Sequence, residues 1–563
     1  MKVVIVGGVA GGATAAARLR RLDETAEIVV FERSGFVSYA NCGLPYYIGG
    51  VIEDEAELTL QTPESFYRRF RVVMKVHHEV TAIDRAAKTV TVRNLETGET
   101  FAERYDKLLL APGAKPTQPA LPGVGLDRLF TLRTVEDTLR IRRFVEEHKP
   151  RSAVLAGGGF IGLELAENLR ELGMEVTIVQ RPRQLMTPFD ADMAALIHRE
   201  VRSHGVRLAL GHTVEGFAEA GGGIQVLLKD EAPLQADMVV LAIGVTPDSH
   251  LAAEAGLALG LKGSIVVNDR MQTSDPDIYA VGDAVQVEQF VSKQPALIAL
   301  AGPANKQGRI AADNMAGGDS HYTGSQGSSV LKIFTLTAAA TGLNESAARK
   351  AGLDADAVIL SPMNHAGYYP GGQVLTMKVI YERPTGRILG AQIVGGDGVD
   401  KRIDVLATAI RAGMTAADLT ELDLAYAPPY ASAKDPVNMA GYLIENLLTG
   451  KVRQFRLAEL ETLPRDGSVQ RVDARTPGEY RHGHADGFVN LPLDELREHL
   501  AELDAAKPVY VMCQSGLRSY LACRILAQHG FTCYNVAGGY RFYEAVTTDR
   551  AQSTRAFACG MDR

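Results

Sequence analysis

The stretch KVVIVGGVAGGATAAARLRRL (residues 2–22) decides the fold of the N-terminal region. Its apolar run ends in glycines and leads into an alanine-rich segment, a pattern that predicts a strand, a tight turn and a helix. A second strand is predicted at EIVVFER (residues 27–33). The same order recurs in SAVLAGGGFIGLELAENLREL (residues 152–172) and MEVTIVQR (residues 174–181). The sequence therefore predicts an α/β fold with two Rossmann-like dinucleotide-binding units.

Length and composition limit the possible classes of protein. The chain has 563 residues, more than the roughly 250–300 at which a single core stops growing, so several domains are expected. Its net charge of −8 argues against nucleic acid or a membrane surface as a partner. The start MKVVIVGG lacks the features of a signal peptide, and no apolar run approaches the roughly 18 residues of a membrane span. We therefore expect a cytoplasmic protein with reduced thiols.

The rest of the chain indicates further domains. Strand-like segments at residues 105–114, 237–248 and 277–284 complete the two nucleotide units. From about residue 325, strands at 330–342, 375–382 and 388–396 precede a helix at 401–413, which predicts an α+β module. Beyond a polar linker, short strands and helices at 493–503 and 518–530 predict a smaller α/β domain. The predicted domains are 1–148 and 271–324 (first nucleotide unit), 149–270 (second), 325–448 (α+β), 449–458 (linker), 459–548 (small α/β) and 549–563 (flexible tail).

The first glycine fingerprint, GGVAGG (residues 7–12), has Val9 where the pattern GxGxxG has its middle glycine. Its glycines can still bring the backbone and a helix N-terminus close to a pyrophosphate: Gly7, Gly8, Gly11 and Gly12. Glu32, at the end of the second strand, can accept from ribose hydroxyls. A turn without a ligand is the alternative for so degenerate a motif. The segment TSDPDIYAVGDA (residues 273–284) favours FAD, because Asp283 suits a ribityl hydroxyl.

The second fingerprint is intact and follows a predicted strand, which makes it a specific signal for NAD(P)H. Its members are Gly157, Gly159, Phe160, Ile161 and Gly162. An NADH-selective site would have an acid at the end of the next strand, where this chain has Gln180, Arg181, Pro182 and Arg183. The arginines could accept a 2′-phosphate, so we favour NADPH with dual use possible. Alternatively, both arginines face solvent.

Four further motifs give the chain a family resemblance. They are SYANCGLPYYIGG (residues 38–50), YYPGG (368–372), KRIDVL (401–406) and YAPPYASAKDPVNMAGY (426–442). With the two fingerprints, they resemble the pyridine nucleotide–disulfide oxidoreductases, and among these the coenzyme A-disulfide reductase group. The resemblance implies FAD and NAD(P)H as cofactors, a dimerisation domain at 325–448 and a homodimer. It also implies cofactor contacts at Arg33, Val80, Ala111 and Gly244.

Cys42 is the candidate redox residue. It has no second cysteine nearby, so it cannot form an internal disulfide. In the group that the chain resembles, this cysteine forms a mixed disulfide with a small thiol. Attack requires the thiolate, so we expect the Cys42 pKa to be depressed by a helix end or by the flavin. A buried, inert cysteine is the alternative, although Asn41, Gly43 and Pro45 argue against an apolar core.

The resemblance also assigns residues to proton donation and to substrate binding. Tyr368 and Tyr426 take the place of the usual histidine–glutamate pair and are supplied by the other subunit, although packing tyrosines are an alternative. Six residues match the family's coenzyme A-binding positions or lie beside them: Thr14, Arg18, Arg21, Ser38, Asn41 and Lys434. Arg18 and Phe70 depart from the family's pattern, and Arg69 and Arg71 flank the latter.

The C-terminal region resembles a rhodanese domain in RVDARTPGEYRHGHADGFVNLPL (residues 471–493), CQSGLRS (513–519) and NVAGGY (535–540). We expect the loop's N–H groups and Arg518 to surround the Cys513 sulfur and stabilise a persulfide, while Asp473 and Arg475 brace the loop. A non-catalytic sulfur-carrier or docking module is the alternative.

The remaining cysteines complete a set of five: Cys42, Cys513, Cys523, Cys533 and Cys559. The odd number and the absence of a CxxC pair argue against a disulfide scaffold and against a metal site. Cys523 and Cys533 are expected in the core, and Cys559 is either a surface thiol or a sulfur relay. The combined prediction is reduction of coenzyme A disulfide, coenzyme A persulfide or polysulfide by NAD(P)H. The alternative is an NAD(P)H oxidase that reduces oxygen through a cysteine sulfenic acid.

Overall fold

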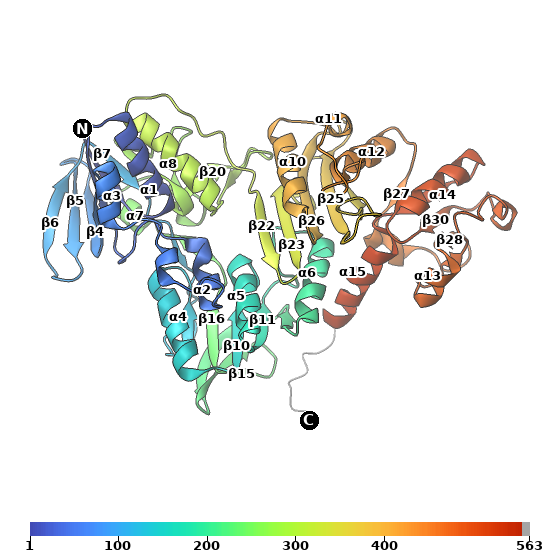
Figure 1. Ribbon diagram of the computed structural model, residues 1–563, viewed down its shortest axis with the longest axis horizontal. Helices are drawn as coiled ribbons and strands as arrows, with labels where there is room; N and C mark the ends of the chain where they lie inside the picture. The colour runs from blue at the N-terminus through green and yellow to red at the C-terminus, as the bar shows by residue number, and fades with distance from the viewer. Residues whose placement is uncertain (554–563) are drawn as a thin grey trace. The chain divides into compact units, whose positions relative to one another are not determined.

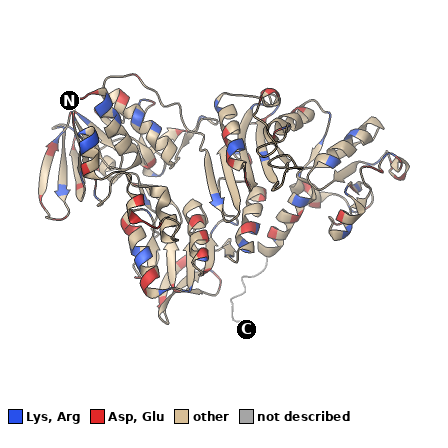
Figure 2. Ribbon diagram, viewed as in Figure 1, with Lys and Arg blue, Asp and Glu red and all other residues tan. Residues whose placement is uncertain are grey.

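The computed structural model describes residues 1–553. It divides into two compact units: residues 1–183 with 205–327, and residues 184–204 with those described from 328 onward. Both are mixed α/β, as the sequence predicts. Figure 2 shows positions of Lys and Arg and of Asp and Glu interspersed along the helices of each unit. No helix within residues 1–553 combines the length and the apolar character that a membrane crossing requires.

The first fingerprint lies in a five-stranded parallel sheet of the first unit, with strand order β19-β7-β1-β2-β3. Helices α1 and α8 lie side by side against it (Figure 1), and a Cβ on Gly308 of α8 would lie 2.4 Å from the Gly11 carbonyl oxygen of α1. Strand β19 brings the predicted segment 271–324 back to this sheet. The elements are β1 (Lys2–Val6), α1 (Ala10–Leu22), β2 (Glu27–Phe31), β3 (Val73–Lys75), β7 (Lys107–Leu110), β19 (Ile278–Ala280) and α8 (Ala301–Met315).

The second fingerprint lies in another five-stranded parallel sheet of this unit, with order β12-β11-β10-β16-β9. Strand β9 belongs to it because it pairs with β16, although the predicted boundary at 148/149 placed it in the first domain. The elements are β9 (Leu129–Thr131), α4 (Val135–His148), β10 (Ser152–Ala156), α5 (Phe160–Glu171), β11 (Glu175–Gln180), β12 (Arg207–Leu210) and β16 (Met238–Leu241).

Two three-stranded antiparallel sheets, β4-β5-β6 and β13-β14-β15, accompany the two parallel sheets. Short helices α2 and α3 connect β2 to β3, and α2 packs against α4 and α5 (Figure 1). The elements are α2 (Leu44–Ile48), α3 (Pro63–Phe70), β4 (His78–Asp84), β5 (Thr89–Asn94), β6 (Thr100–Arg104), β13 (Val214–Ala220), β14 (Gly223–Leu228) and β15 (Leu234–Ala236).

The second unit contains the predicted α+β module as a five-stranded antiparallel sheet, with order β22-β23-β26-β25-β24. Helix α10 covers β23 and β26, and α11 packs against α12. The elements are β22 (Ser329–Ile333), β23 (Leu336–Gly342), β24 (Ala355–Leu360), β25 (Leu375–Glu382), β26 (Ile388–Gly395), α10 (Val399–Arg411), α11 (Ala416–Glu421) and α12 (Pro436–Leu448).

Helix α6 (Ala191–Ser203) also belongs to the second unit, although the prediction placed it in the domain 149–270. The buried Lys378 ammonium on β25 explains this: its Nζ lies 3.1 Å from Asp190 and 2.9 Å from Asp192, at the start of α6. Glu345 contributes a third carboxylate at 2.9 Å. A buried ammonium needs such counter-charges, so it holds the helix to the sheet.

The C-terminal region forms a parallel sheet with order β27-β31-β30-β28-β29 and three main helices. Strand β27 comes from the predicted linker 449–458 and pairs with β31. The predicted helix at 493–503 was wrong: these residues form turns and the 3₁₀ turn Leu500–Glu502. The elements are β27 (Gln454–Phe455), β28 (Gln470–Asp473), α13 (Pro477–His482), β29 (Val489–Asn490), β30 (Val509–Met512), α14 (Leu517–Gln528), β31 (Cys533–Val536) and α15 (Gly539–Ser553).

Helix α15 extends into the predicted tail, so residues 549–553 are helical. It packs against α6, where Asp549 forms an ion pair with Arg202 and a hydrogen bond with the buried His198, whose Nδ1 lies 2.9 Å from the carboxylate. The His198 Nε2 accepts a hydrogen bond from the Leu185 N–H. These contacts attach the C-terminal domain firmly to the rest of the second unit.

Candidate functional site

The first glycine fingerprint forms a tight backbone cradle. Gly7 has φ of +96°, and a Cβ there would lie 2.1 Å from the Ala111 carbonyl oxygen. A Cβ on Gly12 would lie 1.9 Å from the Gly7 carbonyl oxygen. Helix α1 begins directly after Val9, with no side-chain cap and no acid in its first turn. This uncapped N-terminus, approached through glycines, fits a dinucleotide pyrophosphate.

Glu32 lies at the mouth of this cradle. Its buried carboxylate accepts from the Gly8 N–H at 2.8 Å and from the Ser34 N–H at 2.9 Å. The two bonds fix the side chain beside the turn, where the prediction requires a ribose acceptor.

The second cradle repeats this geometry. A Cβ on Gly157, whose φ is +123°, would lie 2.1 Å from the Ala242 carbonyl oxygen, whereas a Cβ on Gly159 would meet no atom within 4 Å. The open side of Gly159 lies at the uncapped start of α5 and leaves room for a phosphate. Gln180 Oε1 accepts from the Gly158 N–H at 3.0 Å, as Glu32 does from Gly8. The second site thus has a neutral amide where the first has a carboxylate.

Arg181 and Arg183 follow Gln180 and are both exposed. The stem of Arg183 passes close to Gly211, where a Cβ would lie 3.1 Å from Arg183 Cγ. Both side chains are therefore accessible from solvent, and their contact with a 2′-phosphate stays a prediction.

Asp283 lies in the 3₁₀ turn Gly282–Ala284 after β19. Its carboxylate forms an ion pair with Arg133, whose guanidinium nitrogen lies 2.7 Å from Oδ2. Among the other expected cofactor contacts, Arg33 pairs with Asp248 at 2.8 Å, Val80 is buried on β4, and Gly244 has φ of +111°. These residues lie in the first unit, and their contacts with a cofactor stay predictions.

Cys42 is accessible to solvent in the 3₁₀ turn Asn41–Gly43, immediately before α2. Packing on its protein side raises the pKa of the thiol, and the nearby Glu164 carboxylate raises it further, while Arg133 opposes the shift. The expected depression of the Cys42 pKa was therefore wrong for the chain by itself. Helix α2 has only five residues, and burial together with the carboxylates of Glu164 and Asp283 outweighs the one nearby cation, Arg133.

Glu164 is the residue that sequence reasoning missed. Burial raises the pKa of its carboxyl to about 7, helped by Glu167 one turn later. The pKa of Tyr46, beside Cys42 on α2, is raised to about 12 by burial and by the same two carboxylates. The sequence carried a weak signal, because Glu164 stands within the largely apolar run FIGLELA (residues 160–166). Which side chain it faces could not be read from that pattern.

The expected substrate-binding residues of the first unit lie near the start and end of α1 and in the loop that leads to Cys42. Ser38 has φ of +47°, and its N–H donates to the Gly8 carbonyl oxygen at 2.8 Å. Thr14 Oγ1 donates to Asn305, and Arg18 forms an ion pair with Asp313 at 2.6 Å. Arg18 is thus partly neutralised, whereas Arg21 is exposed.

In the second unit, Tyr368 and Tyr426 come together although 58 residues separate them: their hydroxyl oxygens lie 2.8 Å apart. The side chains are 76% and 47% exposed. Hydrogen bonding to Tyr426 raises the pKa of Tyr368. Lys434 is also exposed in this unit. Such exposed tyrosines are typical of a surface that another subunit can cover.

The Cys513 loop forms the expected nest in part. The Cys513 sulfur, fully buried, accepts from the Gly516 N–H and from the Ser519 hydroxyl, both at 3.2 Å. Gly516 has φ of +97° and directly precedes α14. The backbone thus presents a donor to the sulfur, as an anion-binding loop requires.

The orientation of Arg518 differs from the prediction, which placed its guanidinium at the Cys513 sulfur together with the loop N–H groups. Its guanidinium forms two hydrogen bonds with Glu479, at 2.6 and 2.8 Å. The guanidinium holds the pKa of Glu479 at about 2. Arg518 lies close enough to interact electrostatically with Cys513, but Glu479 determines its orientation.

Asp473 and Arg475 form a buried pair that supports the loop. The Arg475 guanidinium binds both carboxylate oxygens of Asp473, at 2.7 to 3.1 Å, and donates to Gln514 at 3.1 Å. It also stacks on the Tyr540 ring at 4.0 Å from the ring centre. Because Gln514 follows Cys513, this contact is consistent with the predicted bracing role.

Cys523 and Cys533 lie in the hydrophobic core of this domain, where Cys533 Sγ donates to the Cys523 carbonyl oxygen at 3.2 Å. Cys559 lies outside the described residues. Within residues 1–553, no group of three or more His, Cys, Asp or Glu side chains is arranged to hold a metal ion.

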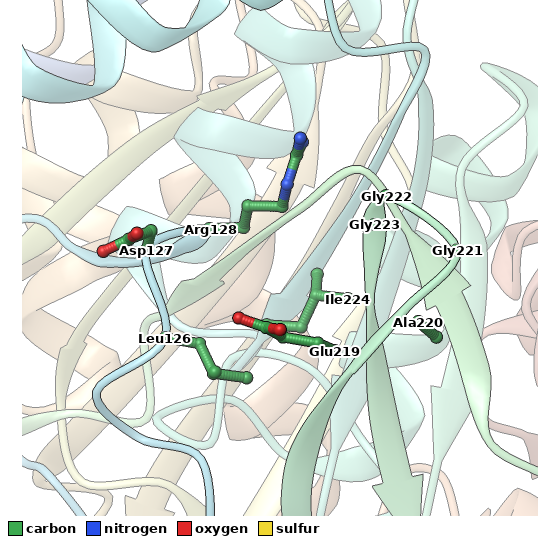
Figure 3. Close-up of a pocket in the computed structure, with 9 residues that line it drawn as sticks. All are labelled: Leu126, Asp127, Arg128, Glu219, Ala220, Gly221, Gly222, Gly223 and Ile224. Atoms are coloured by element: carbon green, nitrogen blue, oxygen red, sulfur yellow. The ribbon is translucent and has the colours of Figure 1, made fainter.

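A surface cavity of 360 Å³ lies elsewhere in the first unit (Figure 3). It is lined by residues 126–128, before β9, and residues 219–224, at the hairpin between β13 and β14. None of the predicted site residues lines it, so it does not alter the candidate site.

Comparison with known proteins agrees with this organisation. Residues 1–308 match the family described as pyridine nucleotide-disulphide oxidoreductase, residues 328–436 its dimerisation domain and residues 456–545 the rhodanese-like domain. A protein named coenzyme A disulfide reductase, from Staphylococcus aureus (strain JH9), is 38% identical over 442 residues, which cover 78% of this chain and 99% of that protein.

Three solved structures are also similar. The reduced Bacillus anthracis CoADR-RHD is 48% identical, with a TM-score of 0.95 and 98% of each chain covered. A NAD-dependent persulfide reductase from A. fulgidus is 36% identical, with a TM-score of 0.91, covering 96% of this chain and all of that one. A water-forming NADH oxidase from Lactobacillus brevis is 30% identical, with a TM-score of 0.77, covering 80% of this chain and 99% of that one.

Proposed function

The chain belongs to the pyridine nucleotide-disulphide oxidoreductase family, whose members use FAD and NAD(P)H, and we propose that it reduces coenzyme A disulfide, coenzyme A persulfide or polysulfide through Cys42. The single accessible Cys42, with no second thiol near it in the described chain, carries this proposal. A lone redox cysteine must form its intermediate disulfide with the substrate. Relatives named for coenzyme A disulfide and for persulfide support that substrate class.

The reaction divides between the residues of the chain as follows. The Cys42 thiolate attacks one sulfur of the substrate, forms a mixed disulfide and expels the other half as a thiolate, which takes a proton. FAD, when bound, would supply two electrons and a proton from NAD(P)H, and with these Cys42 would return to the thiolate while the second half leaves as a thiol. Glycine cradles and uncapped helix starts hold the two dinucleotides in this proposal.

The dimer is part of the proposal, because the paired Tyr368 and Tyr426 lie exposed on the unit that contains the dimerisation domain. Covered by a second subunit, their hydroxyls would donate the proton that the expelled thiolate takes. Thr14, Arg18, Arg21, Ser38, Asn41 and Lys434 remain the proposed contacts of coenzyme A.

Cys513 is proposed to hold sulfane sulfur as a persulfide and to provide it for reduction at Cys42. Its sulfur already accepts two hydrogen bonds in a braced loop, which favours a bound anion over a purely structural cysteine. The complete burial of the sulfur means that a donor enters only when the loop opens.

Oxygen reduction is the second candidate, and the similarity to the water-forming NADH oxidase favours keeping it. In that reaction, oxygen and two electrons from a first NAD(P)H would oxidise Cys42 to a sulfenic acid and release the other oxygen atom as water. Two electrons from a second NAD(P)H would then reduce the sulfenic acid to the thiolate and release a second water. The C-terminal domain, which that oxidase does not cover, has no role in such a reaction. Sulfur reduction uses both domains and is therefore our first choice.

Substrate competition with mass spectrometry tests the proposal. We expect coenzyme A disulfide, coenzyme A persulfide or polysulfide to be reduced at least tenfold faster than oxygen at saturating NAD(P)H. The purified, oxidised protein should carry a coenzyme A adduct on Cys42 and an extra sulfur on Cys513. Oxygen consumption that exceeds the reduction of every sulfur substrate, with no coenzyme A adduct on Cys42, would instead support the oxidase.

The nicotinamide preference is testable at Arg181 and Arg183. We expect the double variant Arg181→Ser/Arg183→Ser to raise KM for NADPH about tenfold and to leave KM for NADH unchanged, since losing a charged phosphate contact costs about 1.5 kcal/mol. Arg143→Ser, another exposed arginine of this unit, is the control. Equal KM changes for both nucleotides would mean that the arginines do not bind the 2′-phosphate.

A further inference from the structure

The two segments that carry Tyr368 and Tyr426 meet at one buried side chain, Arg402 of α10, which is 1% exposed. We propose that Arg402 is a positioning residue for the tyrosine pair, because it holds both segments where the two hydroxyls can bond to each other and donate a proton. This inference rests on the proposed function, in which that proton goes to the expelled thiolate. It adds the residue that sets the position of the donor.

The Arg402 guanidinium binds backbone carbonyl groups of both segments. Its Nη2 donates to the Asn364 carbonyl oxygen at 2.9 Å and to the Tyr430 carbonyl oxygen at 3.3 Å. Asn364 lies four residues before Tyr368, and Tyr430 lies four residues after Tyr426. One planar group therefore fixes the separation of two stretches of chain whose tyrosines are 58 residues apart.

Further hydrogen bonds close the segments on this anchor. The Ala366 N–H donates to the Ala431 carbonyl oxygen at 3.1 Å, which joins the two segments directly. The Asn364 N–H donates to the Gln373 carbonyl oxygen at 2.8 Å, and the Gln373 N–H donates to Asn364 Oδ1 at 2.8 Å. The loop that carries Tyr368 is thus closed at its base, at the residue that Arg402 binds.

Asp435 balances the buried charge of Arg402. Its Oδ2 lies 3.0 Å from Arg402 Nη2, and the two side chains are 4% and 1% exposed. Its Oδ1 accepts from the Val437 N–H at 3.0 Å and so caps α12. A buried ion pair adds little net stability, but losing one partner leaves an uncompensated charge. Such a pair is better suited to fixing a geometry than to stabilising the fold.

Arginine suits this position because a guanidinium reaches several acceptors at once. Arg402 Nη1 donates to the Gly398 carbonyl oxygen at 3.2 Å, while Nη2 binds the two carbonyl groups and the Asp435 carboxylate. The neighbouring Lys401 has a single nitrogen, which donates to the Ala425 carbonyl oxygen at 3.4 Å. A lysine at position 402 would therefore keep the charge beside Asp435 but release at least one tyrosine segment.

Proton donation is sensitive to such a release. The Tyr368 and Tyr426 side chains are 76% and 47% exposed, so little packing of their own holds their hydroxyl oxygens 2.8 Å apart. The hydroxyl that gives its proton to the expelled thiolate is left as a tyrosinate, which accepts from the other hydroxyl and regains a proton from solvent. A misplacement of about 1 Å can cost a reaction up to about 10²-fold in rate.

A double-mutant cycle tests whether Arg402 acts through the tyrosines. The value of kcat/KM for coenzyme A disulfide is measured for the full-length FAD-bound protein as wild type, Arg402→Lys, Tyr368→Phe/Tyr426→Phe and the combined variant. We expect Arg402→Lys to lower it about tenfold and the tyrosine variant about 10²-fold. The combined variant should lose no more than about twofold beyond the tyrosine variant, because no donor is left to misplace. KM for NAD(P)H should stay unchanged throughout.

The opposite results are equally specific. A residue that only stabilises the fold would cost the same tenfold in both backgrounds, and this result would overturn the inference, as would wild-type kcat/KM in Arg402→Lys. Either outcome would leave the proposed role of the tyrosines intact. Wild-type kcat/KM in Tyr368→Phe/Tyr426→Phe would instead overturn that role, and the inference with it.

Two further variants complete the experiment. Arg411→Lys makes the same change at the exposed end of α10 and should keep the wild-type kcat/KM. Arg402→Met/Asp435→Asn removes both buried charges together and keeps the side-chain oxygen that caps α12. It replaces Arg402→Lys if the lysine variant does not fold, and its loss should likewise disappear in the background without the tyrosine hydroxyls.

Discussion

Cys42→Ser is expected to lower the reduction of disulfide and persulfide substrates by at least about 10³-fold, because a serine hydroxyl cannot form the mixed disulfide. FAD should stay bound with an unchanged visible spectrum, since Cys42 lies in a short solvent-accessible turn outside both glycine cradles. Steady-state oxidation of NAD(P)H with each substrate, and flavin content per chain, measure the two results.

Cys513→Ala is the control for that experiment, because it removes a thiol from another domain and should retain reduction of coenzyme A disulfide. A Cys42→Ser protein that reduced disulfide and persulfide at the wild-type rate would contradict the role of Cys42. Loss of FAD together with activity would show instead that Cys42 supports the fold of the cofactor site.

Cys513→Ala is itself expected to abolish sulfur transfer from thiosulfate to cyanide, a loss of at least about 10³-fold in the full-length protein. The substitution removes the sulfur that accepts from Gly516 and Ser519 and leaves the bracing pair of Asp473 and Arg475 intact. Thiocyanate formation measures the result, and the mass of the persulfidated protein reports whether sulfur is bound.

Cys523→Ala is the matched variant for this test. Cys523 is buried in the same core but lies on α14 next to Cys533, so sulfur transfer should persist. Equal loss in both variants would point to a damaged domain rather than to a missing nucleophile. Retained transfer in Cys513→Ala would make the C-terminal domain a docking module.

The nucleotide sites were the most predictable part of the fold. Gly7 and Gly157 adopt positive φ, and a Cβ at either would lie 2.1 Å from a carbonyl oxygen, so the backbone itself demands glycine there. Such a local requirement is written in residue order and can be read without knowing the rest of the structure. The alternating strands and helices around both nucleotide sites were predictable for the same reason.

Predictions that depended on distant partners were less successful. The segment 493–503 has helix-forming residues but forms turns, and the predicted tail from 549 begins as helix because Asp549 binds His198 and Arg202 of α6. Arg518 was expected at the sulfur, but Glu479 engages it. In each case a residue far away in sequence changed the local outcome, as tertiary packing commonly overrides propensity.

The sequence by itself determined the two glycine cradles, the order of the domains and the choice of Cys42 and Cys513 as the reactive candidates. Only the tertiary structure decided their electrostatic surroundings: that Glu164 faces Cys42 and raises the pKa of its thiol, and that Tyr368 meets Tyr426. The physical reason is that a backbone conformation depends on neighbouring residues, whereas a pKa depends on distances and burial that exist only after helices such as α2 and α5 have packed.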